Sequence, residues 1–421
     1  MKRFSILLML SVVLPSLAQA QTMTLADCMS EGLENSYKIK LVRASEEKAA
    51  NSDSWSNAGA LPTLSLTGTY STTDLETHSL GAQVRADWTV FDGLGIQATR
   101  GRLEELHRQG SIQTRITIED YVASLSQEYY DLLRQTIKLR NLEHGLDISR
   151  ERLRVASERY DMGGNSRLEV QQARVYFNSD SASCLKQQEA LLSARIVLNR
   201  LMSNQDFMRG INAAESEISI NENLDYDSLL ADMLEVNASI LKAESSLNLA
   251  EKDRRLVQSR NYPYLKLNAS YGVTDRIEPD RTVTDWTPSL GATVGLNLIT
   301  GKQRTQERNA RLDVLSAEIE CSQLELELRS KLGELWQSYQ SNLKLTELQR
   351  FNLETARETM EMAQERYMLG DLSGLEMREA QNSYLSAEES LLQALYNTKI
   401  SEISLLQISG RLLDYAENGS L

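Results

Sequence analysis

Histidine, cysteine and proline are scarce in this chain of 421 residues, which has three histidines, three cysteines and five prolines. Cys28, Cys184 and Cys321 are an odd number at wide spacings, so they imply no disulfide framework. The histidines show no metal-ligand spacing with them. The sequence offers no nucleophile beside a base, no phosphate-cradling glycine loop and no metal cluster. We therefore expect a protein that is not an enzyme and holds no cofactor.

Long hydrophobic runs are also missing. Lys2-Arg3, the apolar run from Phe4 to Leu14 and the small-residue motif Ala18-Gln19-Ala20 have the order of a secretory signal peptide, with cleavage expected after residue 20. No later stretch approaches the roughly 20 apolar residues that a membrane-spanning helix needs. Any membrane insertion must therefore use strands. Cys28 lies beyond the expected cleavage site, which is a poor fit to a lipoprotein.

Basic residues are too few to balance the acidic ones. The formal net charge of −14 at pH 7 becomes −14 − 2 = −16 once the two cations of the signal peptide are removed. Binding to nucleic-acid phosphates depends on clustered basic residues. We therefore expect no nucleic-acid partner.

The sequence contains an internal duplication, a feature that decides the fold class. ALPTLSLTGTY at 60–70 aligns with NYPYLKLNASY at 261–271, and ERYDMGGNSRLEVQQA from Glu158 aligns with ERYMLGDLSGLEMREA from Glu365. Each half is expected to contain a helix, two strands, a long helix, a tight turn and a further helix.

The duplication divides the chain into five parts: the signal peptide (1–20), a first repeat (21–202), an inter-repeat equatorial segment (203–224), a second repeat (225–410) and a C-terminal tail (411–421). In the first repeat we expect strands at about 63–71 and 79–91, then helices at about 93–161 and 166–202. In the second repeat we expect strands at about 263–272 and 287–299, then helices at about 301–369 and 373–410.

Proline placement and hydrophobic spacing support the long helices. After the signal peptide, prolines occur only at or between the expected strands, at Pro62, Pro263, Pro279 and Pro288. At 1.5 Å per residue, each long helix would extend roughly 100 Å. Alternating four- and three-residue spacing indicates coiled-coil seams at Ile118, Val122, Leu125, Tyr129 and Leu132, and at Leu328, Leu332, Leu335 and Tyr339. Helices alone would fit a soluble coiled-coil rod equally well.

The short segments alternate apolar and polar residues. In the first, Leu64, Leu66, Gly68 and Tyr70 share one face. A half-buried soluble sheet shows the same alternation. The aromatic residues favour a transmembrane sheet instead, because they fall near both ends of the outward faces, as the two membrane interfaces require. This predicted girdle comprises Tyr70, Tyr271 and Trp286 near the hairpin end, and Trp88 and Phe91 near the opposite end.

Four strands cannot close a pore, and open sheet edges are not tolerated in hydrocarbon. Closure therefore requires several copies, and three would give about 12 strands, within the known range of such barrels. We expect a mainly α-helical, internally duplicated chain whose long helices form an α-barrel and whose four strands contribute to a trimeric 12-stranded transmembrane β-barrel. The hairpin tips, Thr72 to His78 and Val273 to Thr287, would be the outer loops.

The duplicated order and the two ERY…G…S..LE…A turns resemble the TolC family of outer-membrane efflux channels, from about Leu25 to Leu412. The resemblance implies a homotrimer, with a barrel in the outer membrane and a helical tunnel in the periplasm. It also implies docking to a periplasmic adaptor protein and an inner-membrane transporter, and a belt formed by residues 203–224 with the tail. The chain would then be the passive exit duct of a tripartite efflux or type I secretion system. The alternative is a non-conducting periplasmic coiled-coil scaffold.

The resemblance also implies an acidic ring at the tunnel mouth, at the positions of Glu376 and Glu379. Three copies would place six carboxylates around one opening, a field that attracts cations. A local alternative exists, because Ser373 to Glu376 and Ser166 to Glu169 both read as capping boxes, in which the glutamate stabilises the helix start.

In relatives the mouth is closed by a tyrosine, an acidic residue and an arginine. Tyr367 and Glu169 match the first two, whereas Leu372 occupies the arginine position. The arginines that could substitute are Arg167, Arg366 and Arg378.

The two helix turns are expected to contact the adaptor. Gly163 and Gly370 would supply left-handed turn residues, and Ser166 and Ser373 follow them. Four methionines near the second turn raise the alternative of copper export, since thioethers suit Cu(I), but methionine more often fills packing gaps. They are Met360, Met362, Met368 and Met377.

Overall fold

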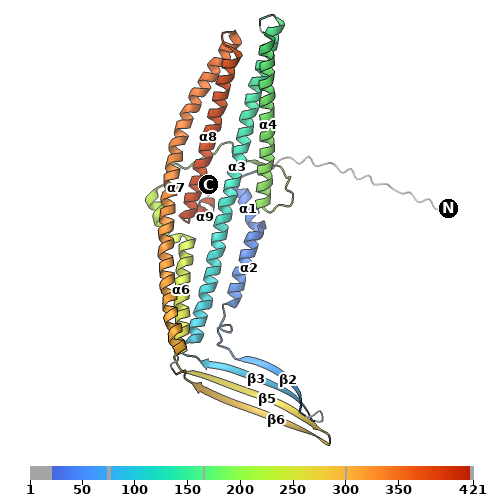
Figure 1. Ribbon diagram of the computed structural model, residues 1–421, viewed down its shortest axis with the longest axis vertical. Coiled ribbons are helices and arrows are strands. Elements are labelled where there is room, and N and C mark those ends of the chain that lie inside the picture. The colour runs from blue at the N-terminus through green and yellow to red at the C-terminus, as the bar shows by residue number, and fades with distance from the viewer. Residues whose placement is uncertain (1–20, 74–76, 165, 299–300, 418–421) are drawn as a thin grey trace, which may run out of the picture.

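The computed structural model describes residues 21–73, 77–164, 166–298 and 301–417, so the expected signal peptide lies outside the described residues. The molecule is long and narrow, with helices along most of its length and a sheet at one end (Figure 1). None of the helices in the described ranges combines the length and hydrophobicity that a membrane span requires.

The two repeats have the same element order. The first comprises β1 (Gln21–Met23), α1 (Leu25–Asn35), α2 (Tyr37–Ser52), β2 (Thr63–Thr72), β3 (His78–Phe91), α3 (Gly95–Asp161) and α4 (Arg167–Leu201). The second comprises α5 (Tyr226–Val236), α6 (Ala238–Ser259), β5 (Tyr264–Glu278), β6 (Arg281–Gly295), α7 (Gly301–Leu369) and α8 (Gly374–Ile408). β4 (Ile211–Ala213) lies between the repeats, and α9 (Leu412–Glu417) follows the second.

Two helices, rather than the single one we expected, precede the strands of each repeat. The breaks fall at Ser36 and Asn237, which are 237 − 36 = 201 positions apart. The Asn237 side chain accepts hydrogen bonds from the N–H groups of Ser239 at 2.9 Å and Ile240 at 3.2 Å. Such a cap starts a new helix and turns the chain, and this is why a continuous helix was the wrong expectation here.

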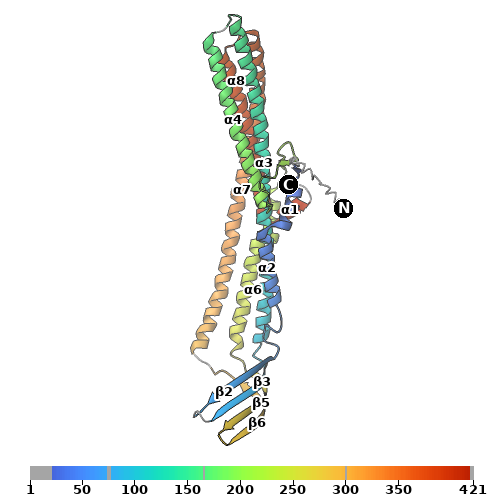
Figure 2. The same ribbon diagram turned by 90° about the vertical axis from the view of Figure 1, so that its right-hand side faces the viewer.

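The long helices pack in two four-helix layers that share α3 and α7. Near the turns the order across the molecule is α4, α3, α8, α7, and near the sheet it is α2, α3, α6, α7 (Figures 1 and 2). The expected seams are in the core: Leu125, Leu132 and Tyr129 of α3 are fully buried, as are Leu332 and Tyr339 of α7. Buried apolar contact with neighbours, rather than helix propensity, stabilises helices of this length.

The inter-repeat segment and the C-terminal tail meet at the middle of the molecule. β4 pairs in parallel with β1, and the Tyr129 hydroxyl of α3 donates to the carbonyl of Met23 at 3.0 Å. Ile218 from the segment and Leu412 from the tail belong to the same buried cluster as Tyr129. The segment is therefore held by backbone pairing with β1 and by apolar burial against α3.

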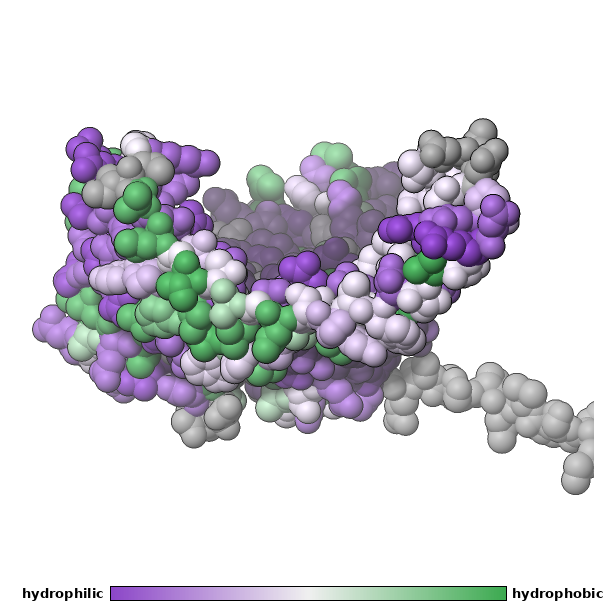
Figure 3. Space-filling view, turned by 90° about the horizontal axis from the view of Figure 1, so that it is seen from below, coloured by the Kyte–Doolittle hydropathy of each residue, from purple (hydrophilic) through white to green (hydrophobic). Residues whose placement is uncertain are grey.

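The four strands form one antiparallel sheet in the order β2, β3, β5, β6. Leu66 lies opposite Val84, Val84 lies opposite Tyr271, and Tyr271 lies opposite Pro288. Directly opposed residues share a face, so the register places the apolar sets of all four strands on one side. Figure 3 shows hydrophobic residues gathered in a band on the sheet end of the molecule. Leu66 is 78% exposed and Leu290 is 86% exposed, so this apolar face is uncovered in the single chain.

The second hairpin is longer than we predicted. β5 continues to Glu278 and β6 begins at Arg281, so most of the loop expected at 273–287 is paired strand. The strand expected at 287–299 ends at Gly295, and its last residue lies outside the described residues. The apolar face stops near Trp286, but backbone pairing continues beyond it to Glu278 and Arg281. The Thr284 hydroxyl also donates to the Asp275 carboxylate at 2.6 Å. Alternation of side chains therefore marked the apolar band rather than the full strands.

Candidate functional site

Two helix turns with matching geometry form the end of the molecule opposite the sheet (Figure 1). Gly163 and Gly370 have φ of 79° and 91°, the left-handed conformation that we expected of them. The N–H of Gly164 donates to the carbonyl of Arg159 at 2.7 Å, and the N–H of Asp371 donates to that of Arg366 at 2.9 Å. This bond closes the last helical turn, and glycine provides the required φ without steric cost.

The caps of the two returning helices differ. At α8, Ser373 Oγ accepts from the N–H of Glu376 at 3.3 Å and Glu376 Oε2 accepts from the N–H of Ser373 at 3.0 Å, which is a complete capping box. These bonds to Ser373 lower the pKa of the Glu376 carboxyl. At α4, Ser166 Oγ accepts from the N–H of Glu169 at 3.3 Å, but the box is only half formed. The expected second box was therefore wrong, because the Glu169 side chain lines a cleft instead.

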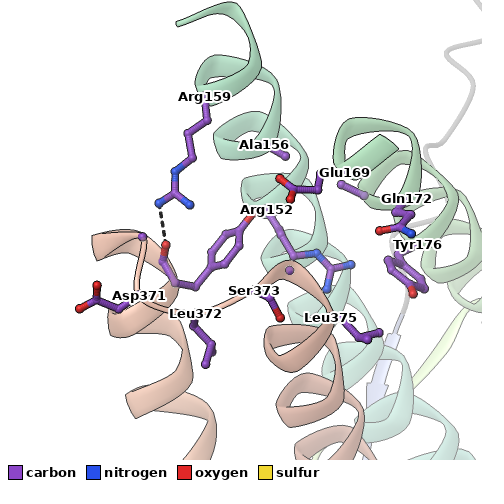
Figure 4. Close-up of a pocket in the computed structure, with 14 residues that line it drawn as sticks. Arg152, Ala156, Arg159, Glu169, Gln172, Tyr176, Asp371, Leu372, Ser373 and Leu375 are labelled. Carbon is purple, nitrogen blue, oxygen red and sulfur yellow. Dashed lines mark hydrogen bonds between the residues drawn. The ribbon is translucent and has the colours of Figure 1, made fainter. Parts of the chain in front are cut away.

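This cleft, of about 410 Å³, lies between α3, α4 and the turn from α7 to α8 (Figure 4). We call it the tip cleft. Both repeats contribute to it, so it joins the two helical hairpins. Its lining residues are Arg152, Ala156, Arg159, Glu169, Gln172, Ala173, Tyr176, Tyr367, Gly370, Asp371, Leu372, Ser373, Gly374 and Leu375.

Tyr367 is buried, and its cationic neighbour comes from the first repeat. The Arg159 guanidinium lies 5.1 Å from the centre of the Tyr367 ring and donates to the carbonyls of Tyr367 at 2.6 Å and Met368 at 3.1 Å. Burial raises the pKa of the Tyr367 hydroxyl. Glu169 lines the same cleft, but no hydrogen bond joins it to Tyr367 within the described ranges. Leu372 occupies the position of the arginine in relatives and carries no charge. Arg159 therefore provides the cation beside Tyr367.

Two further arginines stack on one tyrosine deeper in the hairpins. The guanidinium carbons of Arg152 and Arg378 each lie 5.0 Å from the centre of the Tyr176 ring. Arg378 also binds Asp180 of α4 through contacts of 2.6 and 2.8 Å. Arg378 is therefore engaged in this buried pair. Burial, reinforced by the charge of Arg378, lowers the pKa of Arg152.

Sequence reasoning missed this group of buried polar residues. Gln381 is fully buried and donates to Ser149 Oγ at 2.9 Å and to the carbonyl of Gly145 at 2.8 Å. The available signal was position: Ser149 and Arg152 are three residues apart, the spacing of a helix seam, which apolar residues normally occupy. The members of the group are Ser149, Arg152, Tyr176, Asp180, Arg378 and Gln381.

Glu376 and Glu379 are both exposed on the first turns of α8. Residues three apart lie on the same side of a helix, so the two carboxylates face similar directions beside the turn. Glu376 caps its helix and is exposed at the same time, and the capping and pore-lining roles are compatible for this residue.

The four methionines divide between the core and the surface. Met360 and Met377 belong to a buried cluster with Tyr367, whereas Met362 and Met368 are exposed. Met360 and Met377 therefore fill space in the core, as methionine often does. In the part of the chain that the structure describes, no group of three or more histidine, cysteine, aspartate or glutamate residues is placed to hold a metal ion.

The predicted aromatic girdle lies on the apolar face of the sheet. Tyr271 and Trp286 are in ring contact at 5.6 Å, and Tyr70 stacks on His78 at 6.0 Å. At the helix end of the sheet, the Trp88 indole N–H donates to the carbonyl of Ala60 at 2.9 Å. The fifth member, Phe91, lies opposite Leu265 after a register shift in β3, which returns it to the apolar face.

A sheet with one uncovered apolar face and aromatic residues at both ends, joined to duplicated helical hairpins about 100 Å long, defines the class of outer-membrane channels with a helical extension. The chain belongs to the Outer membrane efflux protein family, whose sequence profile matches residues 28–204 and 229–411. It is an outer-membrane efflux channel protein that extends into the periplasm and serves as a passive exit duct. The gap between the two matched ranges covers most of the inter-repeat segment.

Individual relatives are distant in sequence and close in fold. The chain is 22% identical to the outer membrane efflux protein BepC of Brucella suis biovar 1 (strain 1330) over 342 residues, which cover 80% of this chain and 73% of BepC. It matches VceC from Vibrio cholerae with a TM-score of 0.75 at 18% identity, covering 92% of this chain and 96% of VceC. It matches the Campylobacter jejuni CmeC channel with a TM-score of 0.77 at 16% identity, covering 92% and 86%.

Proposed function

We propose that three copies of this chain assemble head to tail into one channel, with a 12-stranded β-barrel in the outer membrane and a helical tunnel below it. The common apolar face of the sheet carries this proposal, because that face must be covered by lipid. The backbone N–H and C=O groups of the edge strands, β2 and β6, must also find hydrogen-bond partners. β2 and β6 run antiparallel to each other in the described sheet. The β2 strand of one copy can therefore pair with β6 of the next and continue the antiparallel order around a closed barrel.

The same two edges recur along the whole molecule. Near the turns, the outermost helices are α4 and α7; near the sheet, they are α2 and α7. At every level one edge comes from the first repeat (β2, α2 or α4) and the other from the second repeat (β6 or α7). A head-to-tail interface closes into a ring when the rotation between copies allows it.

Exposed apolar side chains lie on both edges, as such an interface requires. Those of α2 and α4 include Tyr37, Leu41, Val175, Leu185, Leu192 and Ile196. Those of α7 include Leu312, Leu315, Ile319, Leu326, Leu345, Leu348 and Phe351. Burial of these side chains between copies would stabilise the tunnel wall without any contribution from the membrane.

Cysteine crosslinking between copies tests the assembly. Leu192 lies 192 − 167 = 25 residues from the start of α4 and Leu345 lies 369 − 345 = 24 residues from the end of α7, so both are at a similar height. In a background without the native cysteines, a chain carrying Leu192→Cys and Leu345→Cys should oxidise to a covalent trimer.

Leu192→Cys with Leu312→Cys is the matched control, because Leu312 is also exposed but lies far down α7. This pair should remain uncrosslinked. A purified mature chain that stays monomeric and water-soluble without detergent would contradict the channel and favour a periplasmic scaffold.

The tunnel mouth is proposed to lie at the helix turns, with Glu376 and Glu379 as its acidic ring and Tyr367 and Glu169 as gate contacts. Exposure of the two glutamates and convergence of the other two on the tip cleft support this assignment. Glu379→Ala should reduce cation selectivity in planar bilayers. Glu320→Ala should not, because Glu320 is exposed on the lower part of α7, away from the turns.

Tyr367→Phe should raise the conductance of the resting channel, and an unchanged conductance would remove Tyr367 from the gate.

The turns are also proposed to dock a periplasmic adaptor, which connects the channel to an inner-membrane transporter. Gly163, Ser166, Gly370 and Ser373 shape these turns. Exposed apolar residues flank each of them at equivalent positions, 207 residues apart: Met162 with Leu369, and Leu168 with Leu375. A photo-crosslinker at position 168 or 375 should capture the adaptor in cells, whereas one at position 207, exposed near the middle, should not. Failure at both turns in an intact complex would refute the contact.

A further inference from the structure

Arg152 is a buried cation that has no acidic partner among the residues that the structure describes. Its side chain is 3% exposed, and its Nε and Nη2 atoms donate to no acceptor among the described residues. Nη1 reaches Gln381 Oε1 only at 3.5 Å. The nearby carboxylate of Asp180 is held by Arg378. An uncompensated buried charge is strongly unfavourable, so this guanidinium needs a ligand that the single chain does not provide.

The unpaired atoms identify the chemistry of that ligand. Nε and Nη2 are the two nitrogens on one edge of the guanidinium, and their N–H groups are parallel. This edge matches the two oxygens of a carboxylate or a phosphate in a bidentate pair. Both nitrogens are shielded from bulk solvent in the single chain, and Arg152 is one of the residues that line the tip cleft.

The surroundings of Arg152 favour an anion. Figure 4 shows its side chain reaching from α3 into the space between Tyr176 and Ser373 at the start of α8. Gly374 and Leu375, the first two residues of α8, line the cleft. Their N–H groups have no acceptor within the helix, and the helix dipole is positive at this end.

Three other charged groups line the tip cleft. Arg159 adds a second cation. The carboxylate of Asp371 points away from the cleft in Figure 4, whereas that of Glu169 extends from α4 toward α3. Glu169 is therefore the acidic group that an incoming anion meets.

We propose that the tip cleft binds one small oxyanion per chain, of the phosphate or carboxylate type, through the Nε and Nη2 edge of Arg152. The bound anion would connect α3 of the first repeat with the first turn of α8 in the second repeat. It would therefore stabilise the two hairpins in their present arrangement at the tip. This site is independent of the adaptor and of the number of copies in the channel.

Titration of the purified, detergent-solubilised protein with inorganic phosphate and with acetate, at constant ionic strength, tests the proposal. Calorimetry should detect one saturable site per chain for at least one of the two probes. Arg152→Gln should weaken binding roughly tenfold or more, and Arg152→Lys, which keeps the charge but loses the bidentate edge, should weaken it less. The matched control is Arg154→Gln, because Arg154 is exposed on the same helix and paired with Glu151 and Glu158. The Arg154→Gln variant should bind the anion as tightly as the wild-type protein does.

Three outcomes overturn the proposal: no saturable binding to the wild-type protein, equal binding to Arg152→Gln, or equal loss in Arg154→Gln. Glu169→Gln separates a free anion from an internal one. If a free anion occupies the site, this variant binds phosphate at least as tightly as the wild type, because a repulsive charge has been removed. If instead the wild type binds nothing and the variant acquires a site, Glu169 itself is the partner of Arg152, and the proposal fails.

Discussion

Arg378 of α8 and Asp180 of α4 form a bidentate ion pair that joins the two repeats, with contacts of 2.6 and 2.8 Å and side chains that are 12% and 13% exposed. Removal of one partner leaves the other charge buried, which costs about 3 kcal/mol or more. Asp180→Asn also leaves Arg378 close to the unpaired Arg152. We expect this variant to lower the free energy of unfolding by roughly that amount in chemical denaturation of the detergent-solubilised protein.

Asp147→Asn is the control for this pair. Asp147 pairs with Arg150 on the surface, where both side chains are more than 60% exposed. Exposed pairs contribute about 0 to 1 kcal/mol. Equal effects of Asp147→Asn and Asp180→Asn would show that the Arg378 pair is not a special contact between the repeats.

The lipid-facing assignment of the sheet is tested by two neighbouring residues in β2. Leu66 lies on the apolar face and Thr67 on the opposite face. Leu66→Lys should impair insertion into bilayers, because a lysine on the lipid face near the midplane costs about 2 to 4 kcal/mol. Thr67→Lys should insert normally, since its side chain would point toward a water-filled lumen. Refolding into lipid vesicles, followed by heat-dependent gel migration, measures both, and equal insertion would contradict the assignment.

The second helix turn depends on the backbone of Gly370. Its φ of 91° is strained for any residue with a Cβ atom, although an added Cβ would meet nothing within 4 Å. Gly370→Ala should therefore lower the free energy of unfolding by about 1 to 2 kcal/mol.

Gly333, within α7, provides a control of opposite sign. A Cβ there also meets no neighbouring atom, and alanine is favoured over glycine inside a helix by roughly 0.5 to 1 kcal/mol. Gly333→Ala should therefore stabilise the protein. Denaturation curves that shift in the same direction for both variants would contradict the role of backbone conformation at the turn.

The capping box at the start of α8 should depend on pH. The hydrogen bonds from Ser373 lower the pKa of Glu376 below its ordinary value of 4.5. A carboxyl whose pKa is depressed by folding contributes stability above its unfolded pKa and loses it as pH falls through the folded value. Amide hydrogen exchange at 374–378 should therefore be faster in Glu376→Ala than in the wild type at pH 6, and the difference should shrink as the pH falls below 4.5 and through the lowered pKa of Glu376. A difference that does not shrink with falling pH would exclude the charge as its cause.

Much of the architecture was predictable because local patterns reported it. Proline exclusion and seam spacing indicated the helices that became α3 and α7, and the glycine turns marked where they end. The alternation from Leu64 to Tyr70 indicated an apolar strand face. These features depend on residues close together in the sequence, where backbone conformation and side-chain direction follow directly from residue type.

The buried polar group at the helix tips was not predictable in the same way. Arg152, Asp180 and Gln381 come from three helices, and the spacing of Ser149 and Arg152 is the one local sign that polar residues occupy a helix seam. Only the packing of α3, α4 and α8 brings them together and removes them from water. The half-formed cap at Glu169 was missed for the same reason, because the cleft that its side chain lines is formed partly by the other repeat.

The sequence by itself determined the duplicated order of helices and strands, the apolar face of each strand and the two glycine turns, since each is a short-range consequence of periodicity or of a required φ angle. The tertiary structure alone decided that the four apolar faces coincide, through the register of β3 with β5, and that Arg152 is buried without an acidic partner among the described residues. The register of β3 with β5 and the contact of Arg152 with Gln381 join residues that are 100 or more positions apart, and free energies of such contacts are not encoded in any local pattern.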